Sequence, residues 1–335
     1  MCITGQHREL LDEVLEIFSI KPHYDLHVMR PNHDLIDLTA RTIVGMKSVI
    51  TNEKPDWVLV QGDTTSAMAA TLAAFYSQTR VGHVEAGLRS HEKAAPFPEE
   101  GNRKIIDALA DRYFVPTETS RNNLLREGVL EKDIIVSGNT VIDALLWVAH
   151  RIANHSQSLE GLESIDWEKR MILVTGHRRE SFGYDIRTIC YSLLRLAKLR
   201  PEINIVYPVH LNPNIQSPVY EILGDAQNIY LLPPQNYEDF VWLMTKAYLI
   251  LTDSGGVQEE GPALGKPVLV MRRVTDRPEG ITAGVAKLTG IELEAIVSHA
   301  TVLLEDETEY ARMAQATNPY GDGHAAERIV EGLSC

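Results

Sequence analysis

Residues 248–260 read Tyr-Leu-Ile-Leu-Thr-Asp-Ser-Gly-Gly-Val-Gln-Glu-Glu and contain the transition that decides the fold. The apolar run at the start is typical of a strand buried on both faces of a parallel sheet. Ser254, Gly255 and Gly256 follow, and small residues at a helix start expose backbone N–H groups that can bind an anion. Glu260 lies about one turn further on, where it could accept hydrogen bonds from a ribose diol. The simpler alternative is an ordinary glycine-rich turn between a strand and a helix.

The same alternation of short apolar runs and amphipathic segments extends over most of the chain. The apolar runs lie at 57–60, 113–115, 134–136, 171–174, 203–206, 229–232 and 268–271. The helical patterns lie at 10–18, 66–76, 141–151, 186–199 and 238–246. Repeated strand–helix order predicts an α/β protein with doubly wound sheets. The 335 residues exceed one ordinary core and suit two such domains.

The regular order is interrupted once, at the polar residues 154–168, which contain no strand-like run. We interpret this segment as the connection between two Rossmann-like halves. The predicted organisation is an N-terminal domain at 1–154, a linker at 155–168, a C-terminal domain at 169–318 and a tail at 319–335. A turn-rich break precedes a short helix at 325–333 in that tail.

The composition narrows the possible partners and compartments. No apolar run reaches the roughly 18 residues that a membrane helix needs, and no signal peptide is visible. Cys2, Cys190 and Cys335 are far apart and form no CxxC pattern, so we predict no zinc site, no disulfide framework and a cytoplasmic location. The net charge of −14 argues against nucleic acid or an anionic membrane as a partner. An anionic ligand would therefore need a local basic cluster.

Acidic residues follow the predicted strands of the first half. Ligands of open α/β sheets bind at the carboxyl ends of the strands, where Asp63, Glu85 and Glu99 are expected. If the three share a cleft, like charges would raise the pKa of at least one and provide acid/base chemistry. Each also has a purely structural explanation. Asp63 could cap a helix, Glu85 could form a surface ion pair, and Glu99 or Glu100 could complement a helix dipole.

The second half supplies the opposite charge. The run 171–174 is followed by the basic residues His177, Arg178 and Arg179. A basic cluster beside a glycine turn favours a phosphate-binding site over the alternative, a loop that only faces solvent. Further candidates at the same edge are His210, Gln235, Tyr237, Phe240 and Arg277. Gln235, Tyr237 and Phe240 could bind and stack on a base, although core packing is the alternative for Phe240. The two halves together predict a bound nucleotide carrying a reactive group.

Several longer strings resemble the bacterial non-hydrolysing UDP-N-acetylglucosamine 2-epimerases. In the first half they are Gln6-His7-Arg8-Glu9, Gly62-Asp63-Thr64-Thr65, His83-Val84-Glu85-Ala86-Gly87-Leu88-Arg89, Pro98-Glu99-Glu100, Asn102-Arg103 and Gly138-Asn139-Thr140-Val141-Ile142-Asp143. In the second half they are Thr175-Gly176-His177-Arg178-Arg179-Glu180, Asp253-Ser254-Gly255-Gly256-Val257-Gln258-Glu259-Glu260 and Gly265-Lys266-Pro267-Val268-Leu269. The resemblance runs from Cys2 to the last helix.

The resemblance implies a glycosyltransferase-B-like fold. Two Rossmann-like domains would face each other across a cleft, and the C-terminal helix would cross back to the first domain. It also implies that C2 of UDP-N-acetylglucosamine is inverted to give UDP-N-acetylmannosamine. UDP would be eliminated to form 2-acetamidoglucal and then added back, without NAD or a metal. A cytoplasmic homodimer that supplies common antigen, capsule or teichoic acid synthesis is the implied context.

The resemblance also implies roles for individual residues. The acidic catalytic positions match Asp63, Glu85 and Glu99, and a catalytic histidine near the departing diphosphate matches His177. The UDP-binding positions match Gln235, Phe240, Ser254, Gly255, Gly256, Glu260 and Arg277. Positions that bind a second, activating UDP-N-acetylglucosamine in some family members match Gln6, His7 and His210.

The start of the sequence departs from the family pattern. Family members open with a strand, a loop similar to Gly-Thr-Arg-Pro-Glu and a helix, a unit of roughly 30 residues. Here Met1-Cys2-Ile3-Thr4 resembles the end of a strand, so we expect exposed sheet edges and weak or absent activity. The alternatives are an epimerase for a diacetamido uronic acid UDP-sugar, a glycosyltransferase of the same fold, and an inactive UDP-sugar-binding protein.

Overall fold

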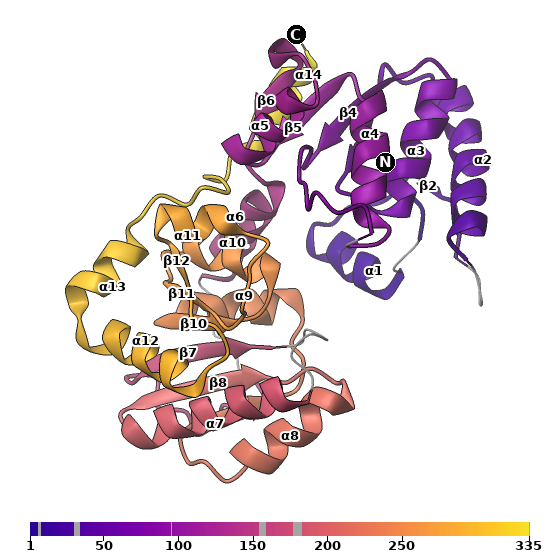
Figure 1. Cartoon of the computed structure of the whole chain (residues 1–335). Helices are drawn as coiled ribbons and strands as arrows, with labels where there is room; N and C mark the ends of the chain where they lie inside the picture. Colours follow the sequence, from indigo (N-terminus) through magenta and orange to yellow (C-terminus); the bar gives the residue numbers. More distant parts are fainter. Residues whose placement is uncertain (6–7, 30–33, 95, 154–158, 177–182, 335) are drawn as a thin grey trace. The chain divides into compact units, whose positions relative to one another are not determined.

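The computed structural model describes residues 1–5, 8–29, 34–94, 96–153, 159–176 and 183–334 (Figure 1). The chain divides into two compact units. The first comprises Met1–Asn139 and Ala325–Cys335, and the second comprises Thr140–His324. Both contain parallel sheets with helices between successive strands, which confirms the predicted α/β class. None of the helices in the described part of the chain has the length and apolar character needed to cross a lipid bilayer.

The second unit is built on a 6-stranded parallel sheet in the order β12-β11-β10-β7-β8-β9. Its strands are β7 (Arg170–Thr175), β8 (Ile203–Pro208), β9 (Ile229–Leu232), β10 (Leu249–Thr252), β11 (Val268–Val270) and β12 (Ala286–Leu288). The chain starts at the centre with β7, moves outward to β9, and returns to place β10 on the other side of β7. This is the Rossmann order, and its direction reverses between β7 and β10.

Helices cover both faces of this sheet. They are α6 (Thr140–Ile152), α7 (Tyr184–Leu199), α8 (Pro213–Leu223), α9 (Tyr237–Lys246), α10 (Gly255–Ala263), α11 (Pro278–Ala283), α12 (Leu293–Glu305) and α13 (Glu307–Ala314). Alternate strand residues such as Ile172 and Val174 pack with α7, α8 and α12 in one apolar cluster. Both faces of the strands are therefore buried, which explains why the sequence shows continuous apolar runs.

The first unit contains a 4-stranded parallel sheet in the order β3-β4-β5-β6. Its strands are β3 (Trp57–Gln61), β4 (Arg80–Val84), β5 (Arg112–Val115) and β6 (Ile134–Val136). Its helices are α1 (Arg8–Ile17), α2 (Leu35–Glu53), α3 (Thr65–Tyr76), α4 (Glu99–Leu109), α5 (Glu118–Arg126), the short 3-10 helix η1 (Glu131–Asp133) and α14 (Ala325–Leu333). Ile329 of α14 packs on Val84 and Phe114, so the end of the chain belongs to this unit.

The unit boundaries differ from the predicted domain boundaries. Helix α6 contacts α9 and α10, so the second unit begins at Thr140 rather than after residue 154. The segment predicted as a linker is packed where it is described, because Leu159, Leu162 and Ile165 are buried. The sequence pattern also missed β12 and β2, which are short strands that carry too few residues for a clear period.

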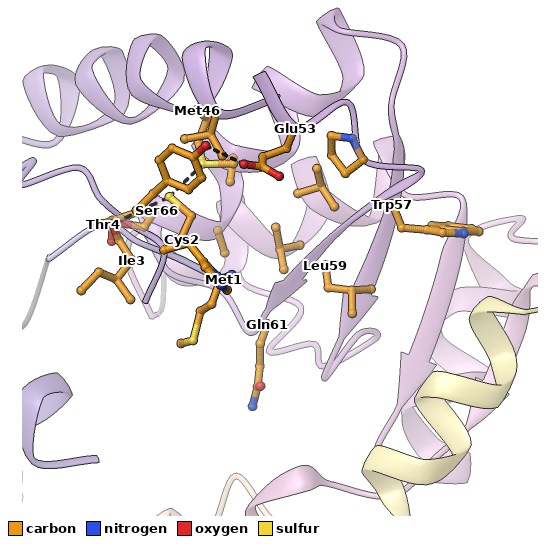
Figure 2. A pocket seen from close by; sticks show the side chains of 18 of the residues that line it. Met1, Cys2, Ile3, Thr4, Met46, Glu53, Trp57, Leu59, Gln61 and Ser66 are labelled. Atoms are coloured by element: carbon orange, nitrogen blue, oxygen red, sulfur yellow. Dashed lines mark hydrogen bonds between the residues drawn. The ribbon is translucent and has the colours of Figure 1, made fainter. Parts of the chain in front are cut away.

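A cavity separates the two sheets of the first unit. Strands β1 (Cys2–Ile3) and β2 (Tyr24–Asp25) form their own 2-stranded parallel sheet, and β3 pairs only with β4 among the described strands. Between β1 and β3 lies a cavity of about 800 Å³, with Met46 of α2 and Ala67 of α3 in its lining. Figure 2 shows the side chains of Met1–Thr4 on one side and those of Leu59 and Gln61 on the other. One edge of each sheet therefore borders this cavity.

Candidate active site

The first group of candidate residues lies at the carboxyl ends of β3 and β4. Asp63 follows β3 after the single residue Gly62, and Glu85 follows β4 directly. The backbone N–H of Gly62 donates to Val84 O at 3.0 Å, so the two loops are adjacent. A Cβ built on Gly62 would lie 3.4 Å from Oε2 of Glu85. The predicted acids Asp63 and Glu85 are thus brought to neighbouring positions at one edge of the sheet.

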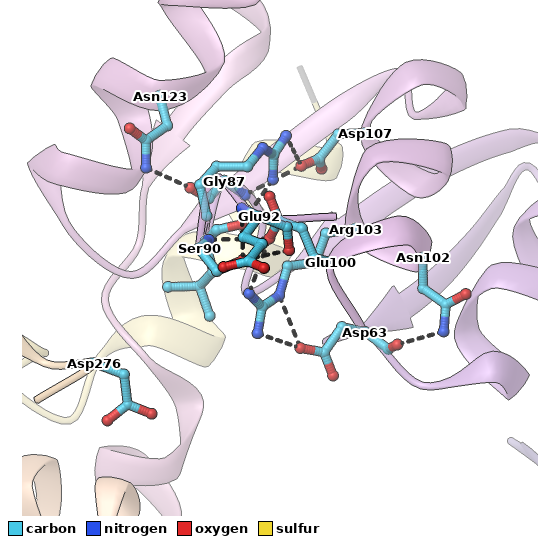
Figure 3. Close-up of polar contacts among 12 residues, drawn as sticks. Asp63, Gly87, Ser90, Glu92, Glu100, Asn102, Arg103, Asp107, Asn123 and Asp276 are labelled. Carbon is cyan, nitrogen blue, oxygen red and sulfur yellow. Dashed lines mark hydrogen bonds and ion pairs between the residues drawn. The ribbon is translucent and has the colours of Figure 1, made fainter. Parts of the chain in front are cut away.

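Helix α4 supplies the third acid and holds the first. Glu99 is the first residue of α4. Arg103 on the same helix donates to Asp63 Oδ2 from Nε at 2.9 Å and pairs with it through NH2 at 2.7 Å (Figure 3). Asn102 donates from Nδ2 to Asp63 O at 2.8 Å. The side chain and the backbone of Asp63 are therefore both tied to α4.

The two adjacent glutamates at the start of α4 have different surroundings. Glu100 is fully buried, and its Oε2 accepts from Ser90 N at 3.0 Å and from Arg103 NH1 at 3.2 Å. Oε2 of Glu99 and Oε1 of Glu100 are both enclosed without a hydrogen-bond partner among the described residues, but only Glu99 is partly exposed and can be reached from outside. A buried carboxylate oxygen without a partner is unfavourable unless a ligand or water satisfies it. Glu99 is thus the acid best placed to receive a group from outside.

A buried charge network lies behind the acids. His83, Asp107 and Arg89 are in direct contact, and Arg89 also pairs with Glu127. Burial disfavours the charged form of Asp107, yet its hydrogen bond with His83 and the nearby Arg89 charge hold its pKa below the usual value. Sequence reasoning missed Asp107. The available signal was the spacing of Glu99, Arg103 and Asp107, which places three charges on one face of α4.

The second group of candidate residues surrounds a cavity in the second unit. Its volume is about 340 Å³, and its lining is Thr175, Gly176, Pro208, His210, Pro234, Gln235, Tyr237, Phe240, Ser254, Val257 and Glu260. These residues lie at or just beyond the carboxyl ends of β7, β8, β9 and β10. The cavity therefore spans the point where the strand order reverses, which is the usual ligand site of an open α/β sheet.

The glycine-rich string quoted first forms the N-terminus of α10. Ser254 is the N-cap residue, and Gly255 begins the helix. Ser254 N donates to Thr252 Oγ1 at 2.9 Å, and Thr252 and Thr175 are joined through their hydroxyl oxygens at 2.5 Å. The first N–H groups of a helix have no acceptor within the helix, and their dipoles favour a negative group. This turn is suited to a diphosphate.

Glu260 lies one helical turn from these residues and is only 7% exposed. Tyr237 donates from its hydroxyl to Glu260 Oε1 at 3.2 Å. Burial raises the pKa of Glu260 to about 7, the Tyr237 hydrogen bond opposes the rise, and the Glu259 charge adds to it. The carboxyl therefore changes charge near neutral pH while it lines the cavity.

The remaining candidates divide into three groups. Gln235, Phe240 and His210 line the same cavity, so Phe240 is not a core residue. Arg277 instead forms a hydrogen-bonded ion pair with Glu259 through Nε. Gln6, His7, His177, Arg178 and Arg179 lie outside the described residues. Within the described ranges, no three His, Cys, Asp or Glu side chains gather to hold a metal ion.

Comparison with known proteins agrees with this arrangement. The family model described as UDP-N-acetylglucosamine 2-epimerase matches residues 1–334. A UDP-N-acetylglucosamine 2-epimerase of Escherichia coli strain K12 is 54% identical over 337 residues, covering 99% of this chain and 90% of that protein.

Solved structures give the same result. The Neisseria meningitidis UDP-GlcNAc 2-epimerase bound to UDP-GlcNAc is 47% identical, with a TM-score of 0.88 over 99% of this chain and 91% of that one. The Methanocaldococcus jannaschii UDP-GlcNAc 2-epimerase in complex with UDP-GlcNAc and UDP is 32% identical, with a TM-score of 0.76 over 99% and 90%. This chain belongs to the UDP-N-acetylglucosamine 2-epimerase family.

Proposed function

We propose that this protein reversibly epimerises UDP-N-acetylglucosamine at C2, giving UDP-N-acetylmannosamine through UDP elimination and re-addition. The observation that carries the proposal is the unsatisfied buried carboxylate oxygen of Glu99, in the same group as Asp63 and Glu85. Removing the C2 proton needs a positioned base, and these acids provide candidates. The second unit adds a cavity at the position where α/β sheets bind nucleotides.

Two acids of the first unit, Glu99 and Glu85, are assigned to proton transfer. Glu99 is proposed as the base that removes the C2 proton, because its Oε2 has no competing partner among the described residues. Oδ2 of Asp63 is already engaged by Arg103, so this oxygen is less available to accept a proton. We therefore assign Asp63 to binding and orientation, and Glu85 to proton delivery on the opposite face of the glycal.

The cavity of the second unit is assigned to UDP. The N-terminus of α10 at Ser254, Gly255 and Gly256 would hold the diphosphate, where negative charge increases as the C1–O bond breaks. Glu260 would accept from the ribose hydroxyls, and Gln235 and Phe240 would contact the base. We retain His177 as the catalytic histidine near the departing diphosphate and Arg277 as a UDP-binding residue, on the family resemblance.

The remaining proposals concern the setting of the enzyme. The family resemblance supports a homodimer, a cytoplasmic location and a second, activating UDP-sugar bound by Gln6, His7 and His210. The free thiols of Cys2 and Cys190 agree with a reducing compartment. Since His210 lines the proposed UDP cavity, we also propose that it contacts the substrate itself.

Incubation of the protein with UDP-N-acetylglucosamine in deuterated water tests the function. We expect proton NMR to show UDP-N-acetylmannosamine with deuterium at C2, because the abstracted proton exchanges with solvent before the glycal is reprotonated.

A diacetamido uronic acid UDP-sugar, incubated in parallel, tests the rival substrate. If deuterium is incorporated only into that sugar, the diacetamido uronic acid UDP-sugar is the substrate and UDP-N-acetylglucosamine is not. Stoichiometric UDP release that requires an acceptor would indicate a glycosyltransferase. Binding of UDP without exchange in either sugar would identify a binding protein.

The affinity for UDP is expected to decrease as the pH falls from about 8 to about 6. Glu260 loses its charge as the pH passes its raised pKa of about 7, and a neutral carboxyl accepts weaker hydrogen bonds from the ribose. A hydrogen bond to a charged acceptor is about 1 kcal/mol more favourable than one to a neutral acceptor, which predicts a decrease in UDP affinity of roughly fivefold. Calorimetric titration of UDP at a series of pH values measures it.

Glu260→Gln is the matched control for this titration, because protonation of the UDP phosphate affects both proteins equally. The variant is expected to bind UDP more weakly at pH 8 and to lose the part of the pH dependence due to Glu260. Identical pH profiles for the two proteins would rule out the ribose contact by an ionised Glu260.

A further inference from the structure

Both carboxylate oxygens of Asp107 are engaged inside the first unit. Oδ1 lies 2.5 Å from Nδ1 of His83, and Oδ2 lies 2.7 Å from NH2 of Arg89. The backbone N–H of Gly87 also donates to Oδ2 at 3.4 Å. The Asp107 side chain is 3% exposed, so it cannot contact a substrate directly. It acts on its surroundings only through the groups that it holds.

One of these contacts leads to the turn that carries Asp63. The other ring nitrogen of His83, Nε2, lies 2.9 Å from the backbone oxygen of Gly62. A carbonyl oxygen can only accept, so Nε2 must carry a proton. Nδ1 of the same ring lies against Oδ1 of Asp107. Asp107, His83 and Gly62 thus form a continuous chain of hydrogen bonds from α4 to the residue before Asp63.

The other contacts lead to the loop that carries Glu85. Arg89 NH2 pairs with Asp107, while its Nε donates to Glu127 Oε1 at 2.8 Å. The backbone of Gly87 is held on both sides, because its N–H donates to Asp107 and its oxygen accepts from Asn123 Nδ2 at 3.0 Å. Asp107 therefore has a cationic partner, Arg89, within the network, and Arg89 has a second anionic partner in Glu127.

The Glu85 loop needs such support. Glu85 has φ of 66°, in the left-handed region that a residue with a side chain rarely occupies. Such a conformation persists only where the surrounding structure enforces it, and it is concentrated at functional sites. The contacts of Asp107 to Gly87 and Arg89 restrain the loop on the carboxyl side of Glu85. Figure 3 shows Asp107 beside Gly87.

We propose that Asp107 is a positioning residue that holds two of the proposed catalytic acids, Asp63 and Glu85, through His83 on one side and through Gly87 and Arg89 on the other. The inference rests on the proposed epimerase function. It adds to that function a residue that aligns the acids. The two acids follow different strands, and one buried carboxylate on helix α4 holds both of them in position. Asp107 belongs to the first unit, and the proposed UDP cavity belongs to the second.

Asp107→Asn tests the proposal without changing the size of the side chain. A carboxylate accepts on both oxygens, whereas the amide replaces one of these acceptors by an N–H₂ group and removes the negative charge that faces His83 and Arg89. A misplacement of about 1 Å can cost roughly 100-fold in rate, and we expect a fall of that order in kcat. The dissociation constant for UDP should stay within about threefold, because the lost interaction serves the transition state.

Two readouts separate positioning from a structural role. With UDP-N-acetylglucosamine deuterated at C2, the isotope effect on kcat should increase in the variant, because proton abstraction by misplaced acids becomes rate-limiting. Loss of folded protein alone would lower the rate in proportion to the folded fraction and leave the isotope effect unchanged. Asp111→Asn is the matched control. Its carboxylate accepts from Val81 N at 2.8 Å, at the amino end of β4, and the amide oxygen of the variant can take over this bond, so the isotope effect should stay unchanged.

The outcomes are distinct. Asp107→Asn protein that retains the wild-type isotope effect, with activity that follows the folded fraction, overturns the positioning role and leaves the epimerase function intact. A wild-type protein that shows no C2 exchange refutes the function and the role that depends on it. Should Asp107→Asn not fold, His83→Gln replaces it. The amide can donate to Gly62 O or to Asp107 but does not span both, and we expect the same change in isotope effect with a loss of about tenfold in kcat.

Discussion

Glu99→Gln is expected to lower kcat by about 1,000-fold, because general acid–base groups contribute roughly 100- to 10,000-fold to such reactions. Glu99 is the acid whose Oε2 is buried without a partner among the described residues, so the amide removes the base and not a structural bond. The UDP dissociation constant should change little. The loss therefore falls on kcat and on C2 proton exchange, measured by NMR in deuterated water, while the folded fraction stays at the wild-type value.

Glu118→Gln is the matched control for Glu99→Gln. Glu118 is also the first residue of its helix, α5, and its side chain is 69% exposed. Both substitutions remove a carboxylate from a first helical turn, so both lose the same interaction with the helix dipole. Only Glu99→Gln should lower C2 exchange. Retention of more than about a tenth of the wild-type rate would assign the base to Glu85 or Asp63 instead.

Gly87→Ala is expected to destabilise the protein by about 3 kcal/mol. Gly87 has φ of 79°, and a Cβ there would lie 2.4 Å from Ser120 O and 2.9 Å from Ser120 C. The left-handed backbone alone costs about 1–2 kcal/mol with a side chain, and overpacking against a fixed backbone adds roughly 1–3 kcal/mol. Urea unfolding followed by circular dichroism measures the loss.

Gly128→Ala separates the two costs of the Gly87 substitution. Gly128 has φ of 90°, and a Cβ there would meet nothing within 4 Å. This variant should lose only the backbone component, about 1 kcal/mol. Gly87→Ala should also lower kcat, because Glu85 and Arg89 lie on the displaced loop. Equal destabilisation by both substitutions would show that the loop at Gly87 yields to the added methyl group.

The local patterns of the sequence predicted the elements of the fold well. Eight apolar runs correspond to strands, and each predicted helix overlaps an observed helix. The string Ser254-Gly255-Gly256 does begin a helix, and Asp63, Glu85 and Glu99 do lie beside strand ends. These features depend on the backbone geometry of a few residues and on how often buried side chains recur along the chain. Both are determined by residues that are close in the sequence. The family strings likewise identified the family from the chain alone.

The grouping of the elements was harder to predict. Helix α6 lies against α9 and α10, which places the unit boundary at Thr140. The amphipathic pattern of α6 shows that one face of the helix is buried, but it does not identify the element that this face packs against. Strands β2 and β12 are too short for their period to be recognised, and their pairing with β1 and β11 defines them.

The sequence by itself determined the α/β class, the strand ends that carry acids, the glycine-rich helix start and the family. Only the tertiary structure decided which acid is paired and which is open. Asp63 meets Arg103 across 40 residues of sequence, and His83 meets Asp107 across 24. Such partners are set by how α4 packs against the ends of β3 and β4. Burial increases the energetic importance of each contact, because a buried charge is destabilising unless a partner lies within hydrogen-bond distance.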